Sequence, residues 1–175
     1  MRVKKLNDEV LLAQGLVVLL GRPDIEALKE QSLLNRRRRI RICAHSGEED
    51  RLHEMFIVHK KGAYIRPHMH LNKIESVHVI EGLVDVVLFD EEGTVTEIIR
   101  MGDLSSGRKF YYRMAAPSYH TLFINSELLV FHEITNGPFR RPDTVFAPWA
   151  PDEGDTAGQV EFMGRLALAV EKSGQ

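Results

Sequence analysis

A series of short apolar runs, rich in β-branched and aromatic residues, occupies the middle of the chain. The runs are Met55–Val58, Val77–Ile80, Val84–Phe89, Val95–Ile99, Thr121–Ile124 and Leu128–Ile134. Dipeptides typical of turns, such as Glu92-Gly93 and Asn125-Ser126, separate these runs. Many short strands joined by tight turns favour an antiparallel sandwich or barrel. We therefore predict an all-β fold.

The composition is that of one globular domain without a charge-driven partner. The chain has 175 residues, of which 43% are hydrophobic and 27% are charged, enough for a substantial core. Its net charge of −2 produces no field that would recruit nucleic acid or a membrane surface. The single cysteine, Cys43, excludes an intrachain disulfide and suits a reducing cytosol.

The N-terminal residues imitate a secretion signal only in part. The basic stretch MRVKK precedes the apolar segment VLLAQGLVVLL, but Asn7, Asp8 and Glu9 interrupt the junction. No small-X-small cleavage site follows Leu20, and the segment is too short to span a bilayer. We expect no targeting signal and a cytoplasmic location. The segment itself is interpreted as two short strands or a hairpin around Gln14-Gly15.

A helix is predicted to precede the basic run at residues 36–39. Pro23-Asp24 is a typical helix start with Asp24 as N-cap, and the segment Ile25–Leu34 carries apolar residues at near-helical spacing. The basic run then places cations at the negative end of the helix dipole. A nucleic-acid patch is the alternative, but no aromatic side chains are interleaved and no recognised binding motif accompanies the charge. We expect no nucleic-acid partner.

The C-terminal part of the chain changes character. The stretch GPFRRPDTVFAPWAPDEG is rich in proline and predicts an irregular strap over the surface. Trp149 is interpreted as a plug that pins this strap to the barrel, with an exposed sugar-stacking platform as the alternative. A short helix is expected over residues 158–171. The chain is thus divided into an N-terminal extension (1–39), a barrel (40–140) and a strap with tail (141–175), all within one domain.

Residues 62–82, GAYIRPHMHLNKIESVHVIEG, contain residue types that bind divalent metals at a spacing that suits a β-scaffold. Side chains two residues apart on a strand project from the same face, so His68 and His70 can bind one ion together. Glu75, on the returning strand, can add a carboxylate oxygen. His78 falls on the opposite face by alternation and is not expected to be a ligand.

The same segment resembles the first motif of the cupin family, with every spacing of its two glycines, two histidines and glutamate matched. Cupins are small β-barrels of the jelly-roll type, the double-stranded β-helix. In the family, a second motif supplies a third histidine, and His120 in AAPSYHTLFIN is the candidate here. Ala115 and Pro117 stand where proline and glycine are usual, and Asn125 is one residue late. The resemblance implies the metal ligands His68, His70, Glu75 and His120.

Three imidazoles and one carboxylate leave two positions of an octahedron open for a ligand. Such a set suits Fe(II), Mn(II), Ni(II), Co(II) or Zn(II), and the choice among these metals stays open. Open positions permit Lewis-acid chemistry or activation of a water molecule. A divalent transition metal is therefore the expected cofactor.

Several neighbouring side chains are candidates for ligand binding. Tyr64 and Arg66 share the face of His68 and His70 provided that Pro67 does not rotate the strand. Arg66 can hold a phosphate or carboxylate, or else it lies at the rim and pairs with an acidic neighbour. Lys73 lies in the loop between the ligands and is placed either to reach a substrate or to remain solvated.

His132 is the candidate catalytic residue. It lies between Val130 and Ile134 on an apolar face that is interpreted as pointing inward. A buried neutral histidine there can act as a general base beside the metal, and a core histidine bonded to the backbone is the alternative. Glu133, on the opposite parity, is expected to face solvent or to be paired.

Segments outside the metal motif extend the resemblance to cupin-fold proteins. FHEITNGPF, TVFAPWAP and the lead-in NRRRRIRICAH resemble the WbuC family of cupin-fold metalloproteins, over roughly residues 25–153. Family members are associated with bacterial surface-polysaccharide gene clusters, so the resemblance implies a metal-binding cupin with a sugar connection.

We therefore expect a protein that binds or acts on a small polar ligand, a sugar derivative being favoured, with isomerase or epimerase chemistry as the hypothesis. An Fe(II)-dependent oxygenase and a non-enzymatic ligand-binding or sensor module are the alternatives. Cupins commonly assemble through strand edges, and uncovered edges are a liability. A homodimer is therefore expected.

Overall fold

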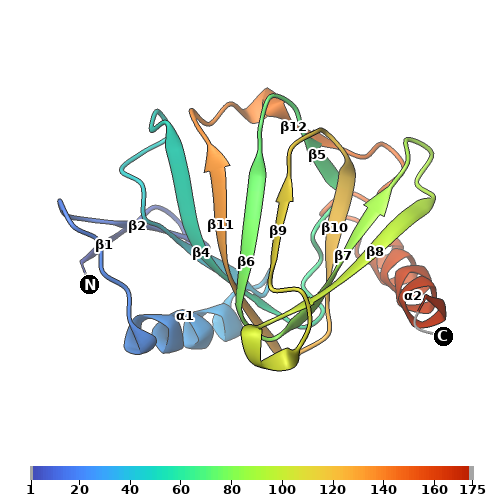
Figure 1. Ribbon diagram of the computed structural model, residues 1–175, viewed down its shortest axis with the longest axis horizontal. Coiled ribbons are helices and arrows are strands. Elements are labelled where there is room, and N and C mark those ends of the chain that lie inside the picture. The colour runs from blue at the N-terminus through green and yellow to red at the C-terminus, as the bar shows by residue number, and fades with distance from the viewer. Residues whose placement is uncertain (1, 174–175) are drawn as a thin grey trace.

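The computed structural model describes residues 2–173, and it consists of two facing β-sheets with one helix on the outer side of each (Figure 1). The first sheet has the order β1 (Val3–Lys5), β2 (Val10–Ala13), β3 (Arg39–Cys43), β4 (Leu52–Lys60), β11 (Leu128–Asn136), β6 (Glu75–Glu81), β9 (Tyr111–Met114). The second has the order β12 (Thr144–Phe146), β5 (His68–His70), β10 (Tyr119–Ile124), β7 (Leu83–Phe89), β8 (Val95–Gly102). This arrangement confirms the all-β jelly roll predicted from the sequence.

Strand pairing is antiparallel except between β2 and β3, which run parallel. All six apolar runs of the sequence lie within strands: β4, β6, β7, β8, β10 and β11. Within residues 2–173 no ladder of paired strands joins the two sheets, although an isolated bridge links Met101 and Lys109. The two sheets therefore form an open sandwich, whereas the sequence predicts a barrel over residues 40–140.

The main core fills the space between the sheets, where apolar side chains from alternate positions of the strands meet. Phe131 on β11, Met55 on β4, Val79 on β6 and Val86 on β7 are among its buried members. Burial of such side chains stabilises each strand pair by roughly 1.5–3 kcal/mol for each large residue. Inward-facing positions are thereby fixed along every strand, which also fixes the positions that can reach a site between the sheets.

Two helices cover the outer faces of the sheets. Helix α1 (Arg22–Leu34) lies across β3 and β4, where Leu28 is fully buried against Ile40 and Val58. Helix α2 (Thr156–Lys172) packs on the second sheet through Phe162, and Figure 1 shows it beside β7 and β8. Both helices were predicted. No helix within residues 2–173 is long and apolar enough to cross a membrane.

The start of α1 differs from the prediction by one turn. Gly21 is the N-cap with an extended backbone, and the carboxylate of Asp24 accepts a hydrogen bond from the Gly21 amide at 2.8 Å. Asp24 is therefore inside the first turn and stabilises the N-terminus from there, where a negative charge is favoured by the helix dipole. Pro23 is tolerated because the first turn needs no amide donor.

The N-terminal hairpin also differs from the prediction. β1 and β2 pair with each other, and the turn between them is closed by the Leu6 amide, which donates to the Val10 carbonyl. The hairpin therefore turns at residues 6–9 rather than around Gln14-Gly15. The polar residues that interrupt the apolar stretch in the sequence form this turn.

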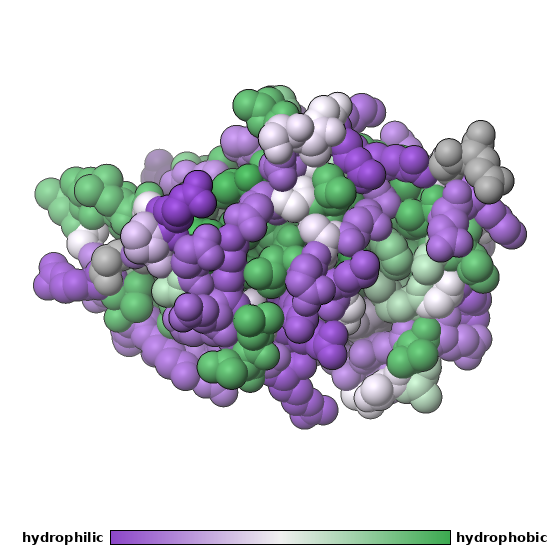
Figure 2. All heavy atoms as spheres, turned by 90° about the horizontal axis from the view of Figure 1, so that it is seen from below, coloured by the Kyte–Doolittle hydropathy of each residue, from purple (hydrophilic) through white to green (hydrophobic). Residues whose placement is uncertain are grey.

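The loop between β2 and α1 alternates between buried and exposed side chains. Val18 and Leu20 pack against the outer core, whereas Leu16, Val17 and Leu19 are largely exposed. The end of the molecule that carries β1 and β2 lies to the left in Figures 1 and 2, and apolar side chains gather at that end of the otherwise mainly polar face in Figure 2.

The C-terminal strap is pinned as the plug interpretation of Trp149 predicts. The indole packs against Phe89, Tyr119 and Phe162, and its Nε1 donates to the carbonyl of Glu91. Upstream of Trp149, the strap contains the 3-10 helix η2 (Arg141–Asp143) and β12, which pairs with β5. A second 3-10 helix, η1 (Leu104–Ser106), follows β8. The strap thus covers the edge of the strand that carries two candidate ligands.

Candidate metal centre

Three histidines from two neighbouring strands converge between the sheets. β5 carries His68 and His70, and β10 carries His120, which pairs directly with His68. One ring nitrogen of each lies within 4.8 Å of the others. The alternation of side chains along β5 places His68 and His70 on one face, and the ladder between β5 and β10 sets the third imidazole beside them.

Hydrogen bonds to the far side of each ring fix how the histidines are oriented. Nδ1 of His68 lies 2.8 Å from the carbonyl of Arg66, and Nδ1 of His120 lies 3.0 Å from the carbonyl of Ser118. A carbonyl oxygen only accepts, so Nδ1 of both rings donates and the Nε2 lone pair is left available. This bonding pattern is the one that holds histidine in the orientation required of a metal ligand.

Burial disfavours the protonated form of His68, and metal binding requires a neutral ring. His120 is only 3% exposed. Burial, together with the neighbouring His120 and His70, lowers the pKa of His68 to about 3. A neutral imidazole presents a lone pair to a cation, whereas a protonated one repels it. The three rings therefore fit a divalent metal ion.

Glu75 on β6 lies beside two of the histidines. Its Oε2 is 3.3 Å from Nε2 of His70 and its Oε1 is 3.7 Å from Nε2 of His120. Burial opposes its ionisation, but the hydrogen bonds from His70 and Tyr112 and the proximity of His120 outweigh burial and lower the pKa of Glu75. The group of ligand atoms that all lie within 4.8 Å of one another contains the three histidines and not this carboxylate.

Two further residues lie near Glu75: Tyr112, which the sequence did not indicate, and Glu133, whose inner position corrects the expectation that it faces solvent. Tyr112 on β9 donates its hydroxyl to Oε1 of Glu75. Glu133 on β11 pairs across the ladder with Val77, and Val77 pairs with Tyr112. Glu133 therefore lies on the inner face, one row of side chains away from Glu75. Burial and the charge of Glu75 raise the pKa of Glu133 to about 7.

His132 lies on the outer face of the first sheet, which corrects the expectation that it points inward. Its ring stacks on Phe56 at 4.4 Å, and its Nε2 lies 3.8 Å from Glu54. The register of β11 is set by Phe131, which is buried between the sheets, so the next residue must face away. His132 pairs with His78, which lies on the outer face as expected.

Tyr64 is also placed away from the histidines, which corrects the expectation that it shares their face. Its ring packs on Phe162 of α2, and its hydroxyl donates to the carbonyl of Pro151 at 2.8 Å. Burial raises the pKa of Tyr64 to about 12. The physical reason is the irregular backbone before β5: Ala63 and Ile65 point into the core, and the chain changes parity at Pro67.

Arg66 also precedes the change of parity at Pro67, and its side chain lies at the rim of the sandwich, beside the strap. It forms an ion pair with Asp152 in the strap, and its guanidinium lies 5.0 Å from the ring centre of Phe146. Its placement corresponds to the rim arginine paired with an acidic neighbour rather than to a residue beside His68 and His70.

Lys73 lies in the loop between β5 and β6 and is partly exposed. Its Nζ is 5.1 Å from the ring centre of Phe139. Burial lowers the pKa of Lys73, and the nearby carboxylates Asp143 and Glu133 oppose that shift. The ammonium group is thus held near the same end of the first sheet as Glu133.

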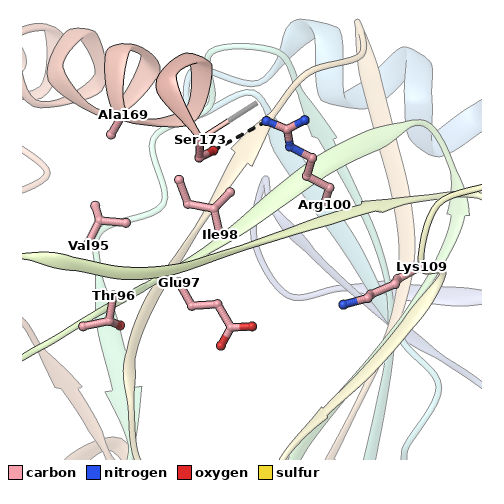
Figure 3. A pocket seen from close by; sticks show the side chains of 8 residues that line it. All are labelled: Val95, Thr96, Glu97, Ile98, Arg100, Lys109, Ala169 and Ser173. Atoms are coloured by element: carbon pink, nitrogen blue, oxygen red, sulfur yellow. Dashed lines mark hydrogen bonds between the residues drawn. The ribbon is translucent and has the colours of Figure 1, made fainter. Parts of the chain in front are cut away.

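A separate pocket of about 640 Å³ lies between β8 and α2 (Figure 3). Arg100 reaches across it to Ser173 on the helix side, with a guanidinium-to-Oγ distance of 3.5 Å. Its lining residues are Val95, Thr96, Glu97, Ile98, Arg100, Lys109, Ala169 and Ser173. None of these residues belongs to the histidine cluster.

Comparison with known proteins shows a similar fold in solved structures but no match to a curated protein. A family model described as a domain of unknown function (DUF6016) matches residues 20–101. No curated protein matches. Among solved structures, protein SO0799 from Shewanella oneidensis is 13% identical, with a TM-score of 0.50, 61% of this chain covered and 72% of that chain.

Two further solved structures have lower TM-scores and are much longer. Oxalate decarboxylase from Bacillus subtilis is 21% identical over 56% of this chain and 24% of that chain, with a TM-score of 0.45. Procruciferin, an 11S globulin from Brassica napus, is 12% identical over 66% and 23%, with a TM-score of 0.42. This chain therefore spans about a quarter of each of those two proteins.

The protein has the cupin fold. Its two facing sheets form the jelly roll, and the short strand β5 with its neighbour β10 carries the three converging histidines. Fold and cluster together support a metal-binding cupin in the general sense.

Proposed function

We propose that the protein is a metal-dependent cupin that binds a small polar ligand and moves a proton on it, as an isomerase or epimerase does. The observation that carries this proposal is the convergence of three imidazoles in which Nδ1 of His68 and of His120 donates to a backbone carbonyl. Nε2 of His70 and of His120 faces the carboxylate of Glu75. A divalent ion bound there would supply Lewis-acid polarisation of a carbonyl or hydroxyl oxygen of the ligand.

His68, His70 and His120 would hold the ion, and Glu75 is proposed as a fourth ligand. Its carboxylate is ionised and lies beside two of the three rings. Tyr112 donates a hydrogen bond to the same carboxylate and so fixes its direction.

Glu133 is proposed as the group that accepts and returns the proton. It faces the space between the sheets, one row from Glu75, and its pKa of about 7 is suited to proton transfer near neutral pH. His132 is not a candidate for this role because its ring lies on the outer face.

The sequence likeness to WbuC-family cupins supports a sugar derivative as the ligand. The segments FHEITNGPF and TVFAPWAP that carry the likeness include part of β11 and all of β12, and β12 pairs with the strand that carries His68 and His70. We therefore favour a substrate from bacterial surface-polysaccharide metabolism. A homodimer remains part of the proposal.

Deuterium exchange tests the proposed reaction. Zn²⁺- and Mn²⁺-loaded protein would be incubated in D₂O with hexoses, hexuronates and hexose phosphates, and carbon-bound deuterium would be followed by NMR. We expect metal-dependent exchange that falls at least about 100-fold in Glu133→Gln and is unchanged in the matched outer-face variant His132→Gln. Equal exchange by Glu133→Gln would contradict the proposed base.

Other outcomes would identify a different function. Absence of exchange together with a saturable ligand-induced rise in melting temperature would favour a binding module. Consumption of O₂ by Fe²⁺-loaded protein with one of these compounds would favour an oxygenase. Either result would replace the isomerase proposal.

A further inference from the structure

Arg41 on β3 has its side chain on the inner face of the first sheet. It is two residues from Cys43, which has the same parity and is buried in the core between the sheets. It pairs with Ile57, another inward-facing core residue. The first sheet has more strands than the second, and Arg41 is exposed near the side where the first sheet extends further.

Arg37 and Arg39, which share the parity of Arg41, are each paired with carboxylates. Glu9 lies 3.2 Å from Arg37 and 3.0 Å from Arg39, and Glu153 forms ion pairs with both arginines. Within residues 2–173, no carboxylate lies within ion-pair distance of the Arg41 guanidinium. Arg41 is thus exposed and inward-facing, with its side chain hydrogen-bonded to Cys43 and its charge acting on Glu133 from beyond ion-pair distance.

Arg41 lies close enough to the proposed proton acceptor for one small molecule to contact both. Cys43 pairs with Met55, and Met55 pairs with Glu133, so these three residues form one row across the sheet. Adjacent strands lie about 4.8 Å apart, so β3 and β11 are separated by roughly 10 Å. Arg41 lies one row away from the row of Cys43, Met55 and Glu133, and its side chain is longer than that of Glu133. The two side chains are close enough for the charge of Arg41 to act on Glu133.

We propose that Arg41 forms an anion subsite, so that the ligand of the metal centre carries a carboxylate or phosphate group. A guanidinium offers parallel donors that match both groups and remains charged at any physiological pH. Held at Arg41, such a ligand extends across Glu133 toward the histidines. This inference rests on the proposed function and narrows its ligand to an acidic sugar derivative.

Calorimetric titration of Zn²⁺-loaded protein with glucuronate, glucose 6-phosphate and glucose tests this subsite. We expect at least one of the two acids to bind about tenfold or more tightly than glucose. Arg41→Gln should abolish that preference, and Arg41→Lys should retain part of it because the charge remains without the bidentate geometry. Arg36→Gln, which removes an exposed arginine of the same run, should leave it unchanged.

The two acids distinguish the sources of the anion: a preference for glucuronate indicates a carboxylate ligand, and a preference for glucose 6-phosphate indicates a phosphate ligand. Equal binding by wild type and Arg41→Gln would overturn the proposal. So would equal binding of acids and glucose, or no binding of either acid at millimolar concentration.

Failure of this inference can be told from failure of the proposed function. If deuterium exchange occurs on neutral hexoses and no acid is preferred, the subsite is wrong and the reaction stands. If the preference for acids persists in the double variant His68→Ala with His70→Ala and no compound exchanges, the subsite stands and the metal-dependent reaction is wrong.

Discussion

Thr144 on β12 pairs with His70 on β5, and its Oγ1 lies 3.3 Å from Nδ1 of that histidine. The strap thereby supplies to His70 the partner that backbone carbonyls supply to the other two histidines. Outer partners of this kind orient the ring and set which nitrogen faces the metal. The strap is therefore expected to contribute to metal affinity as well as to cover a strand edge.

Replacing Thr144 tests that contribution. Thr144→Val keeps the shape of the side chain and removes its hydroxyl, and we predict that Zn²⁺ binds about 10- to 100-fold more weakly. Thr144→Ser keeps a hydroxyl and should remain close to wild type. Competition with a chromophoric chelator measures both affinities. Identical affinity in wild type and Thr144→Val would show that the contact does not orient His70.

The raised pKa of Glu133 predicts a particular pH dependence of stability in metal-free protein. The folded protein holds this proton up to about pH 7, whereas the unfolded chain releases it near the ordinary value of 4.5. Folding thus binds a proton in that window, so the contribution of Glu133 makes the free energy of unfolding fall as pH rises. The full loss is about 3 kcal/mol at most.

Comparison with Glu133→Gln isolates this contribution. The lowered pKa of His68 has the opposite sign, because the unfolded chain gains that proton as pH falls below 6.5. Urea unfolding at pH 5 and pH 8 should show that the variant gains stability relative to wild type at the higher pH. A difference that does not change with pH would mean that Glu133 is not held protonated.

Gly82, at the end of the metal motif, is predicted to be intolerant of a side chain. Its φ is +96°, and an added Cβ would clash with the carbonyl oxygen of Leu128. We expect Gly82→Ala to lower the free energy of unfolding by about 2 kcal/mol or more. Gly62, with φ of +79°, would meet only the flexible end of Arg38 at 3.2 Å. Gly62→Ala should therefore cost less, and equal losses in urea unfolding would contradict this reading.

The sequence was sufficient for the strands and for the three histidines because both depend on local spacing. Each apolar run is bounded by turn residues, and the two histidines on β5 differ by the two-residue period of a strand. His120 could be identified because the family pattern expects a histidine in a later strand. The motif glycines occupy left-handed backbone positions, which explains why glycine is present there.

The orientation of β11 could not be predicted, because both of its faces are apolar. Val130 is buried under α1, and Phe131 is buried between the sheets. Alternation identifies the inner face only when the other face is solvated, so the sequence pattern alone favours His132 rather than Glu133 for the inner position. Helix α1 was predicted, but nothing in the sequence specified which strands it covers.

The remaining site residues depend on pairings that are distant in sequence. Tyr112 reaches Glu75 because β9 pairs with β6, and Thr144 reaches His70 because the strap forms β12. Neither pairing has a local signal in the sequence. The loss of alternation at Pro67, which moved Tyr64 outward, is likewise a backbone event that composition does not reveal.

Metal content of purified protein tests the central claim most directly. The double variant His68→Ala with His70→Ala removes two converging ligands, and the matched control His78→Ala with His132→Ala removes two histidines from the outer face. Mass spectrometry or atomic absorption after loading with Zn²⁺ or Mn²⁺ should find close to one bound ion per chain in wild type and control and almost none in the first variant. Equal metal content in both variants would contradict the assignment of the metal centre to this cluster.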